Sequence, residues 1–157
     1  MRKLHFLIAI AGWSFIFHPS LAAQEQNTNN ALLYIELGGN AIIWSVNIEA
    51  RFKDRERLGW GLRLGAGTIG EIAAFVPLGV NYVFGKQSSP HHFVGGVGTT
   101  FLADFEENSG QALGFFNFMY RFMPVHDGLT FHIGFTPYID KWFNWRPWFG
   151  IGIGSNF

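Results

Sequence analysis

Apolar and polar residues alternate along most of the chain, and this period of two is typical of β-strands with one apolar face. Between residues 42 and 52, Trp44 and Ile48 fall on one face, whereas Asn47 and Glu49 fall on the other. Seven further segments repeat the pattern, over residues 33–38, 60–67, 76–85, 93–105, 116–122, 129–136 and 149–154. Only 93–105 is ambiguous, because glycines and threonines blur both of its faces. The pattern therefore predicts eight strands.

The breaks between these strands are short. They fall near residues 39–40, 53–58, 70–74, 86–91, 106–113, 124–128 and 140–146. Short connections join antiparallel neighbours, whereas parallel strands need long crossovers. An even number of strands lets the last strand pair with the first, so we expect an all-β, eight-stranded, antiparallel up-and-down barrel over residues 31–157.

The face that points outward decides the class of barrel. Charged residues make up only 14% of the chain, against roughly 25% in ordinary soluble domains, and this is too few to cover a soluble surface. The polar face is small and glycine-rich, which suits the narrow interior of an eight-stranded barrel. An apolar exterior around a polar interior is typical of a transmembrane β-barrel. The competing interpretation is a secreted soluble barrel with an aromatic cavity.

Aromatic residues, which form 18% of the chain, gather toward the strand ends. Membrane barrels carry two such belts, one at each interface with water. The predicted lipid-facing and belt residues are Trp44, Phe52, Trp60, Tyr82, Phe84, Tyr120, Phe122, Trp142, Trp145 and Trp148.

The N-terminus has the features of a secretory signal peptide. Arg2 and Lys3 precede a twelve-residue apolar run over 6–17, and small residues follow it. The run is shorter than the roughly 17–25 residues that a membrane-spanning helix needs, so we expect residues 1–22 to be removed, with cleavage after Ala22 or Ala23. Residues 23–30 would then form a short mobile tail. The mature chain would carry a net charge of −2, and nothing in it suggests nucleic-acid binding.

The chain ends on Phe157, with apolar residues in phase behind it at Ile153, Ile151 and Phe149. This ending resembles the C-terminal strand that the barrel-assembly machinery reads in bacterial outer-membrane proteins. Together with the signal and the eight strands, it makes the chain similar to the small eight-stranded outer-membrane barrels of the OmpA-barrel and OmpX type. The resemblance implies a bacterial outer-membrane location, both termini in the periplasm, and outer-membrane lipid and the assembly machinery as partners.

Any chemistry should be found among the polar residues that face the barrel interior. The alternation predicts this set as Tyr34, Glu36, Asn47, Glu49, Arg51, Arg63, Asn81, Asn117, Arg121 and His132. Across the shared turns, Glu49 is expected opposite Arg63 as an inward ion pair, and Arg121 beside His132. Buried charges need partners, so we interpret these residues as filling and satisfying the interior.

Three functions are compatible with such a barrel. The first is a non-enzymatic structural role in the envelope with a polar, largely plugged interior, and the second is a narrow channel or small-molecule transport barrel. The third is a lipid A-modifying enzyme. Deacylases of this type resemble Ser–His hydrolases in which the serine and the histidine stand two positions apart on one strand. Here Gly134 stands at that spacing from His132, and no His accompanies Asp104, Asp140 and Ser109 near the outer rim. We therefore expect no catalytic residues and no cofactor. We also expect no metal, because the adjacent side chains of His91 and His92 would point in different directions on a strand and could not easily bind one ion together.

Overall fold

The computed structural model describes residues 30–53, 56–126 and 128–157. The predicted signal peptide and residues 23–29 of the predicted tail lie outside the described residues. No helix in the described part of the chain is long and apolar enough to cross a bilayer.

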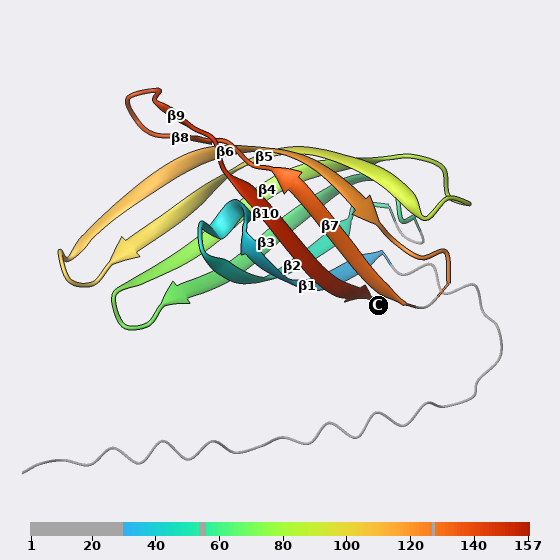
Figure 1. Cartoon of the computed structure of the whole chain (residues 1–157), viewed down its shortest axis with the longest axis horizontal. Helices are drawn as coiled ribbons and strands as arrows, with labels where there is room; N and C mark the ends of the chain where they lie inside the picture. The colour runs from blue at the N-terminus through green and yellow to red at the C-terminus, as the bar shows by residue number, and fades with distance from the viewer. Residues whose placement is uncertain (1–29, 54–55, 127) are drawn as a thin grey trace, which may run out of the picture.

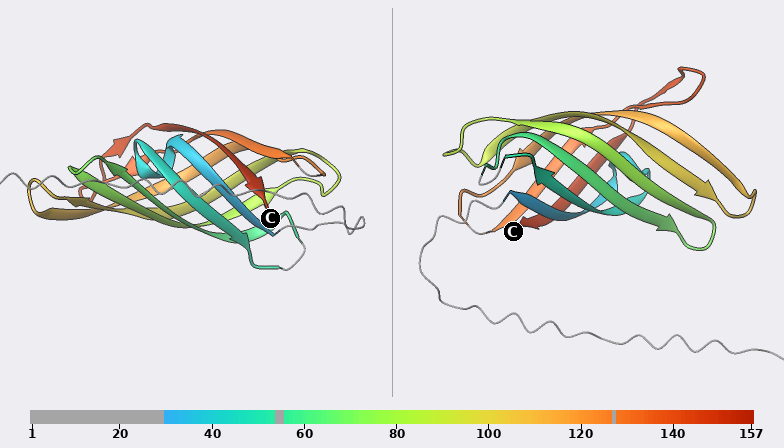
Figure 2. Two further views of the ribbon diagram at one scale, coloured as in Figure 1. Left: turned by 90° about the horizontal axis from the view of Figure 1, so that it is seen from below. Right: turned by 180° about the vertical axis from the view of Figure 1, so that it is seen from behind.

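Eight long strands form the body of the molecule (Figures 1 and 2). They are β1 (Ala31–Gly38), β2 (Trp44–Arg51), β3 (Gly59–Ile69), β4 (Ala73–Phe84), β5 (His91–Asp104), β6 (Ser109–Phe122), β7 (Leu129–Phe135) and β10 (Phe149–Asn156). Each pairs antiparallel with the next, and β10 pairs with β1 to close the ring. The predicted all-β, eight-stranded, antiparallel up-and-down barrel is confirmed.

The barrel has two different ends. The terminal end holds both ends of the described chain, where the Phe157 amide donates to the Ala31 carbonyl at 2.9 Å. The described residues of the connections after β2, β4 and β6 lie at the same end. The distal end holds the 3-10 turn η1 (Gly39–Ala41), the connections 70–72 and 105–108, and a small hairpin made of β8 (Tyr138–Ile139) and β9 (Trp145–Arg146). In Figure 1 this hairpin projects away from the barrel wall.

The two largest differences from the sequence prediction are both at the distal end, whereas the other strand bounds shift by up to three residues. The break expected over 106–113 is wrong, because β6 begins at Ser109, which pairs with Asp104. Residues 109–112 are exposed, so their side chains have no buried face to produce an alternation. The β8–β9 hairpin was not predicted within the last break, because strands of two residues are too short to show a period.

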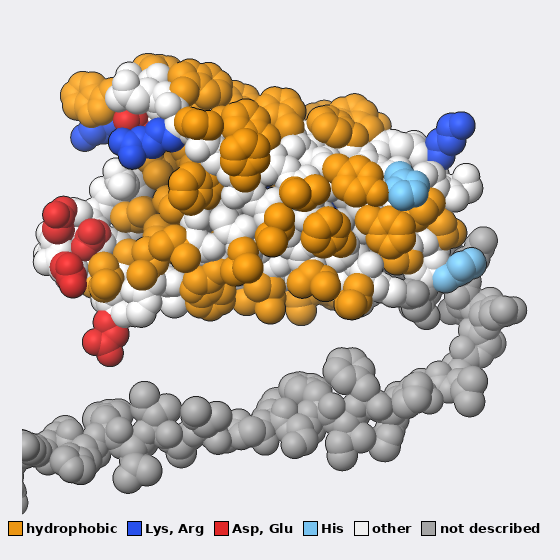
Figure 3. All heavy atoms as spheres, in the orientation of Figure 1, with side chains coloured by type: hydrophobic (Ala, Val, Ile, Leu, Met, Phe, Trp, Pro, Cys, Tyr) orange, Lys and Arg blue, Asp and Glu red, His pale blue; other side chains and the backbone are white. Residues whose placement is uncertain are grey.

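The expected alternation places apolar side chains outside. Trp44, Ile48, Phe118 and Ile133 are all exposed on the outer wall, and apolar groups cover much of the face seen in Figure 3. The strand registers agree with the two predicted interior neighbours, since Glu49 pairs with Arg63 and Arg121 pairs with His132.

The interior is less uniformly polar than predicted. A small apolar cluster lies inside at the terminal end, formed by Val83, Val94, Met119 and Met123 with Leu58 packed on it. A second lies at the distal end, formed by Ala41, Ala73 and Phe75 with flanking Ile42, Ile69 and Leu102. The buried ionisable groups, among them Glu36, Glu49, Arg63 and Arg121, share the interior with these two clusters.

Candidate functional site: the polar interior of the barrel

The structure buries every polar residue that the alternation assigned to the interior. None of the ten retains more than 8% exposure, and they are Tyr34, Glu36, Asn47, Glu49, Arg51, Arg63, Asn81, Asn117, Arg121 and His132. They come from six of the eight long strands, β1, β2, β3, β4, β6 and β7, so the site is assembled from across the lumen.

Glu49 lies at the centre of the terminal half of this site. Arg121 reaches it from the far side of the barrel, with Nη1 donating to Oε1 at 2.5 Å and Nη2 to Oε2 at 3.0 Å. Arg51 also donates to Glu49 Oε1, and Asn81 Nδ2 donates to Oε2 at 2.7 Å. The Arg63 Nε atom lies 3.8 Å from the same carboxylate. A single carboxylate thus forms ion pairs with three guanidinium groups.

Arg63 links this half to a second carboxylate, Glu36. Its Nη2 atom lies 3.7 Å from Glu36 Oε1, and its guanidinium carbon lies 5.0 Å from the centre of the Tyr34 ring. His132 Nε2 hydrogen-bonds Glu36 Oε1 at 3.2 Å and contacts the Tyr34 ring edge-on. Charges therefore alternate along the lumen as Arg51, Glu49, Arg63 and Glu36, which we call the charged column.

At the distal end the chain itself closes the lumen. The turn η1 folds inward, and its residues Gly39, Asn40 and Ala41 are buried. The Asn40 amide donates to Glu36 Oε2 at 3.2 Å, and the Thr100 hydroxyl donates to the Asn40 carbonyl. A Cβ at Gly39, whose φ is +60°, would overlap the Glu36 carboxylate, so glycine permits this close approach.

Tyr138 fixes the closing turn from the opposite wall. Its hydroxyl donates to the Gly39 carbonyl and accepts from the Ile42 amide at 3.1 Å. The alternation could not predict Tyr138 and Asn40 as interior residues, because Asn40 lies in a turn and Tyr138 in a two-residue strand, where no period assigns a face. The Gly38-Gly39 pair was the available sequence signal for a tight turn at this point, because glycine adopts positive φ readily.

Replacing Tyr138 with phenylalanine should lower the free energy of unfolding by about 1–2 kcal/mol, because the part-buried Ile42 amide and the buried Gly39 carbonyl each lose a hydrogen-bond partner. Tyr82→Phe on the exterior is the matched control, with an expected change within about 0.5 kcal/mol. Guanidinium unfolding in detergent micelles, followed by tryptophan fluorescence, measures both. Equal midpoints for the two variants would show that Tyr138 does not hold the turn.

The terminal end is also closed. Arg57 donates from Nη2 to the Met123 carbonyl at 2.5 Å and also to the Pro124 carbonyl, so the connection after β2 is tied to the connection after β6. The cavity lined by Glu49, Arg51 and Arg121 beneath it has a volume of about 10 Å³, and a single water needs about that much space. The interior has no room there for a ligand.

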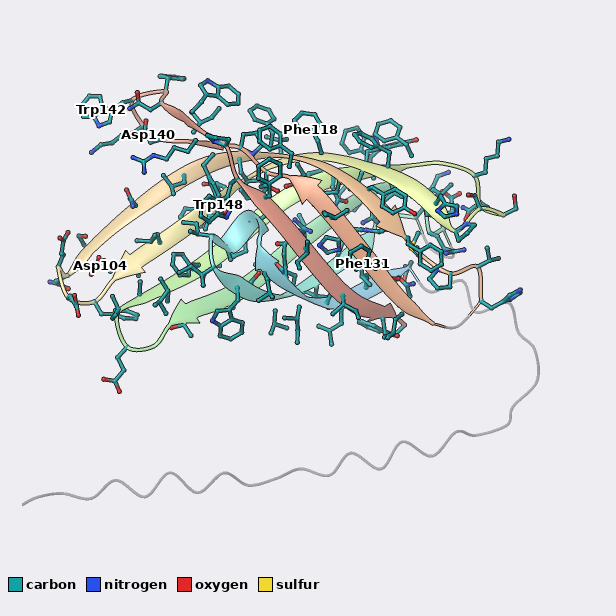
Figure 4. All side chains as sticks on the ribbon, in the orientation of Figure 1. Asp104, Phe118, Phe131, Asp140, Trp142 and Trp148 are labelled. Atoms are coloured by element: carbon teal, nitrogen blue, oxygen red, sulfur yellow. The ribbon has the colours of Figure 1, made fainter. Side chains whose placement is uncertain are left out.

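The residues considered for the alternative of a lipid A-modifying enzyme do not come together in the described part of the chain. His132 faces Glu36 inside the lumen, whereas Asp104 and Ser109 pair at the tip of the β5–β6 hairpin. Asp140 lies at the tip of the β8–β9 hairpin (Figure 4) and binds Asn144 through both carboxylate oxygens. These positions form no Ser–His–Asp arrangement.

The aromatic residues predicted for the exterior lie on it and form two groups. Of the ten, Tyr82 and Phe122 are half-buried and the others are exposed. At the terminal end, rings contact one another in a row, Trp60 with Tyr82, Tyr82 with Phe84, and Phe84 with Phe93. At the distal end, Trp145 stacks on Phe116 with ring centres 5.8 Å apart. Phe149, Ile151, Ile153 and Phe157, the residues of the predicted assembly signal, are exposed along the last strand and just after it.

No family model matches the chain, and a search of curated proteins and of solved structures finds no significant match.

Proposed function

We propose that the chain is an integral protein of the bacterial outer membrane, exported by a signal peptide, with a structural role in the envelope and no enzymatic activity. The observation that carries the proposal is the inversion of the usual arrangement: aliphatic and aromatic side chains cover the barrel wall, while arginines and glutamates are buried within it. Such an exterior is costly in water and stable in hydrocarbon. Closure of the sheet satisfies the backbone, as a bilayer requires.

The filled lumen supports a structural role over a channel. The charged column and the two closed ends leave a cavity of only about 10 Å³ at the terminal mouth. In the proposed orientation both termini face the periplasm, and the outward residues of β10, from Phe149 to Ile153, are offered to the barrel-assembly machinery before closure. Outer-membrane lipid is the partner of the remaining wall.

Two measurements test this proposal. In the outer-membrane fraction, the unboiled protein should resist SDS and migrate differently from the boiled protein. In planar bilayers the purified barrel should add no steady conductance above that of lipid, with a wide-bore porin as positive control. A protein found soluble in the periplasm would contradict the membrane assignment, whereas an inserted barrel with steady ion conductance would instead establish the channel function.

A further inference from the structure

A further cavity lies outside the lumen. It is a groove of about 330 Å³ on the distal half of the wall, between the β5–β6 hairpin and the β8–β9 hairpin. Its lining is mainly apolar and includes Val97, Ala112, Phe116 and Ile139. A volume near 300 Å³ is at the lower limit of small-molecule sites, so the groove suits one short, slender group.

Small residues and a strand departure create this groove. β8 pairs with β6 only at Gly114 and Phe115, and the chain then leaves the wall and turns back at residues 140–144. Gly114 forms part of the floor, and a Cβ built there would meet only the Ile139 carbonyl oxygen, at 3.7 Å. The space over Gly114 is therefore open to a ligand.

The outer rim of the groove carries one cation, Lys141, and one anion, Asp140. Lys141 lines it, with its Nζ 5.3 Å from the centre of the Trp142 ring. Asp140, also at the rim, accepts from the Trp142 amide at 2.8 Å and the Asn144 amide at 3.0 Å; hydrogen bonds from Asn144 are the main reason that its pKa is lowered. The Asp140 carboxylate is thus used to form the turn, whereas the Lys141 ammonium remains at the surface.

The rest of the hairpin favours an interfacial position. Trp142 and Phe143 are 73% and 82% exposed, and in Figure 4 Trp142 points away from the barrel. Arg146 adds a second cation on β9. The acidic residues Asp104, Glu106 and Glu107 lie in and beside the β5–β6 turn, and in Figure 3 most red groups at that end lie apart from the basic groups, whereas one lies against them. An aromatic hairpin carrying cations is suited to the layer of lipid headgroups.

We propose that this groove binds one phosphorylated lipid of the surrounding leaflet, with a stretch of acyl chain over Gly114 and the phosphate beside Lys141. Charge complementarity selects this occupant, because the groove offers an apolar floor and a cation at its outer edge in one continuous surface. The proposal rests on the proposed function, since it needs the groove to lie within the lipid leaflet.

Native mass spectrometry of the refolded full chain in detergent tests it, using dilauroyl phosphatidic acid as the probe and dilauroyl glycerol as its phosphate-free counterpart. Wild type should bind one phosphatidic acid, at least about fivefold more tightly than the diacylglycerol, since one cation near a membrane surface contributes about that factor. An excess of inorganic phosphate should not displace the lipid.

Paired variants locate the site. Gly114→Leu fills the floor and should weaken phosphatidic acid binding by about tenfold, the effect of excluding roughly two methylene groups. Gly95→Leu adds the same bulk on the same wall, where a Cβ meets only the Phe84 ring at 3.5 Å, and should leave binding unchanged. Lys141→Gln should remove most of the preference for phosphatidic acid, while Lys86→Gln at the terminal end should not.

The outcomes separate the lipid site from the membrane assignment. If the barrel inserts and shows the SDS shift but Gly114→Leu binds lipid like wild type, the lipid site is wrong and the membrane assignment stands. Displacement of the lipid by inorganic phosphate would overturn the lipid site in favour of a free anion. A dimer that Gly114→Leu abolishes would overturn it in favour of a second copy of the chain. A wild-type protein that stays soluble without detergent overturns the proposed function itself.

Discussion

Replacing Glu49 with glutamine is expected to lower the free energy of unfolding of the barrel by about 3–5 kcal/mol, the usual cost of removing one partner from a buried ion pair. Glu49 accepts hydrogen bonds from Arg51, Arg121 and Asn81, and Arg63 lies 3.8 Å away. Without its charge, three buried guanidinium groups share the single carboxylate of Glu36. Guanidinium unfolding in micelles and the temperature of the SDS gel shift measure the loss.

Glu56→Gln is the matched control for this substitution. Glu56 also accepts from a cation, Lys53 at 3.1 Å, but this pair is exposed and should contribute within about 0.5 kcal/mol. The double variant Glu49→Gln with Arg121→Gln should recover part of the loss, because it removes one uncompensated cation with the carboxylate. A Glu49→Gln protein as stable as the Glu56→Gln protein would contradict the role given to the charged column.

The interior residues were predictable because a strand assigns its side chains to two faces by position alone. Once Trp44 and Ile48 are placed outside, Asn47 and Glu49 must lie inside, and the structure buries both. The register of two adjacent strands was predictable for a similar reason. A short connection limits the possible pairings, and an inward Glu49 needs a cation such as Arg63.

Contacts across the lumen were not predictable in this way. Arg121 binds Glu49 although the two are 72 residues apart in the chain and lie on non-adjacent strands. Their meeting depends on the bore of the barrel and on the length of the arginine side chain. The inward turn η1 and the Tyr138 bonds also escape a period-based analysis, because connections have no fixed face.

The apolar clusters inside the barrel show a different limit. Val83 and Met119 alternate in phase with Asn81 and Arg121, so their inward direction follows from the pattern. The pattern does not say which inward positions lie near the ends, where apolar groups can cover the charges. That arrangement depends on how the strands are staggered around the barrel.

Replacing Ile35 with arginine should destabilise the barrel in a bilayer by about 2–4 kcal/mol, the cost of a lipid-facing cation near the middle of a membrane barrel. Ile35 lies midway along β1, is 52% exposed, and has Ile153 and Val46 as cross-strand neighbours. Both of its directly paired neighbours are therefore aliphatic. Urea unfolding from lipid vesicles, with the barrel refolded by dilution, gives the free energy directly.

If the wall lies in lipid, the cost of an introduced arginine should depend on its depth in the bilayer. Phe52→Arg makes a comparable change at an exposed position at the terminal end, where the cost should fall to about 0–1 kcal/mol. A wall surrounded by water gives no such gradient: both variants would then stay within about 0.5 kcal/mol of wild type. Since neither side chain points into the lumen, the charged column is the same in both proteins. A difference between them therefore reports the medium outside the barrel, and equal stabilities would exclude a membrane around Ile35.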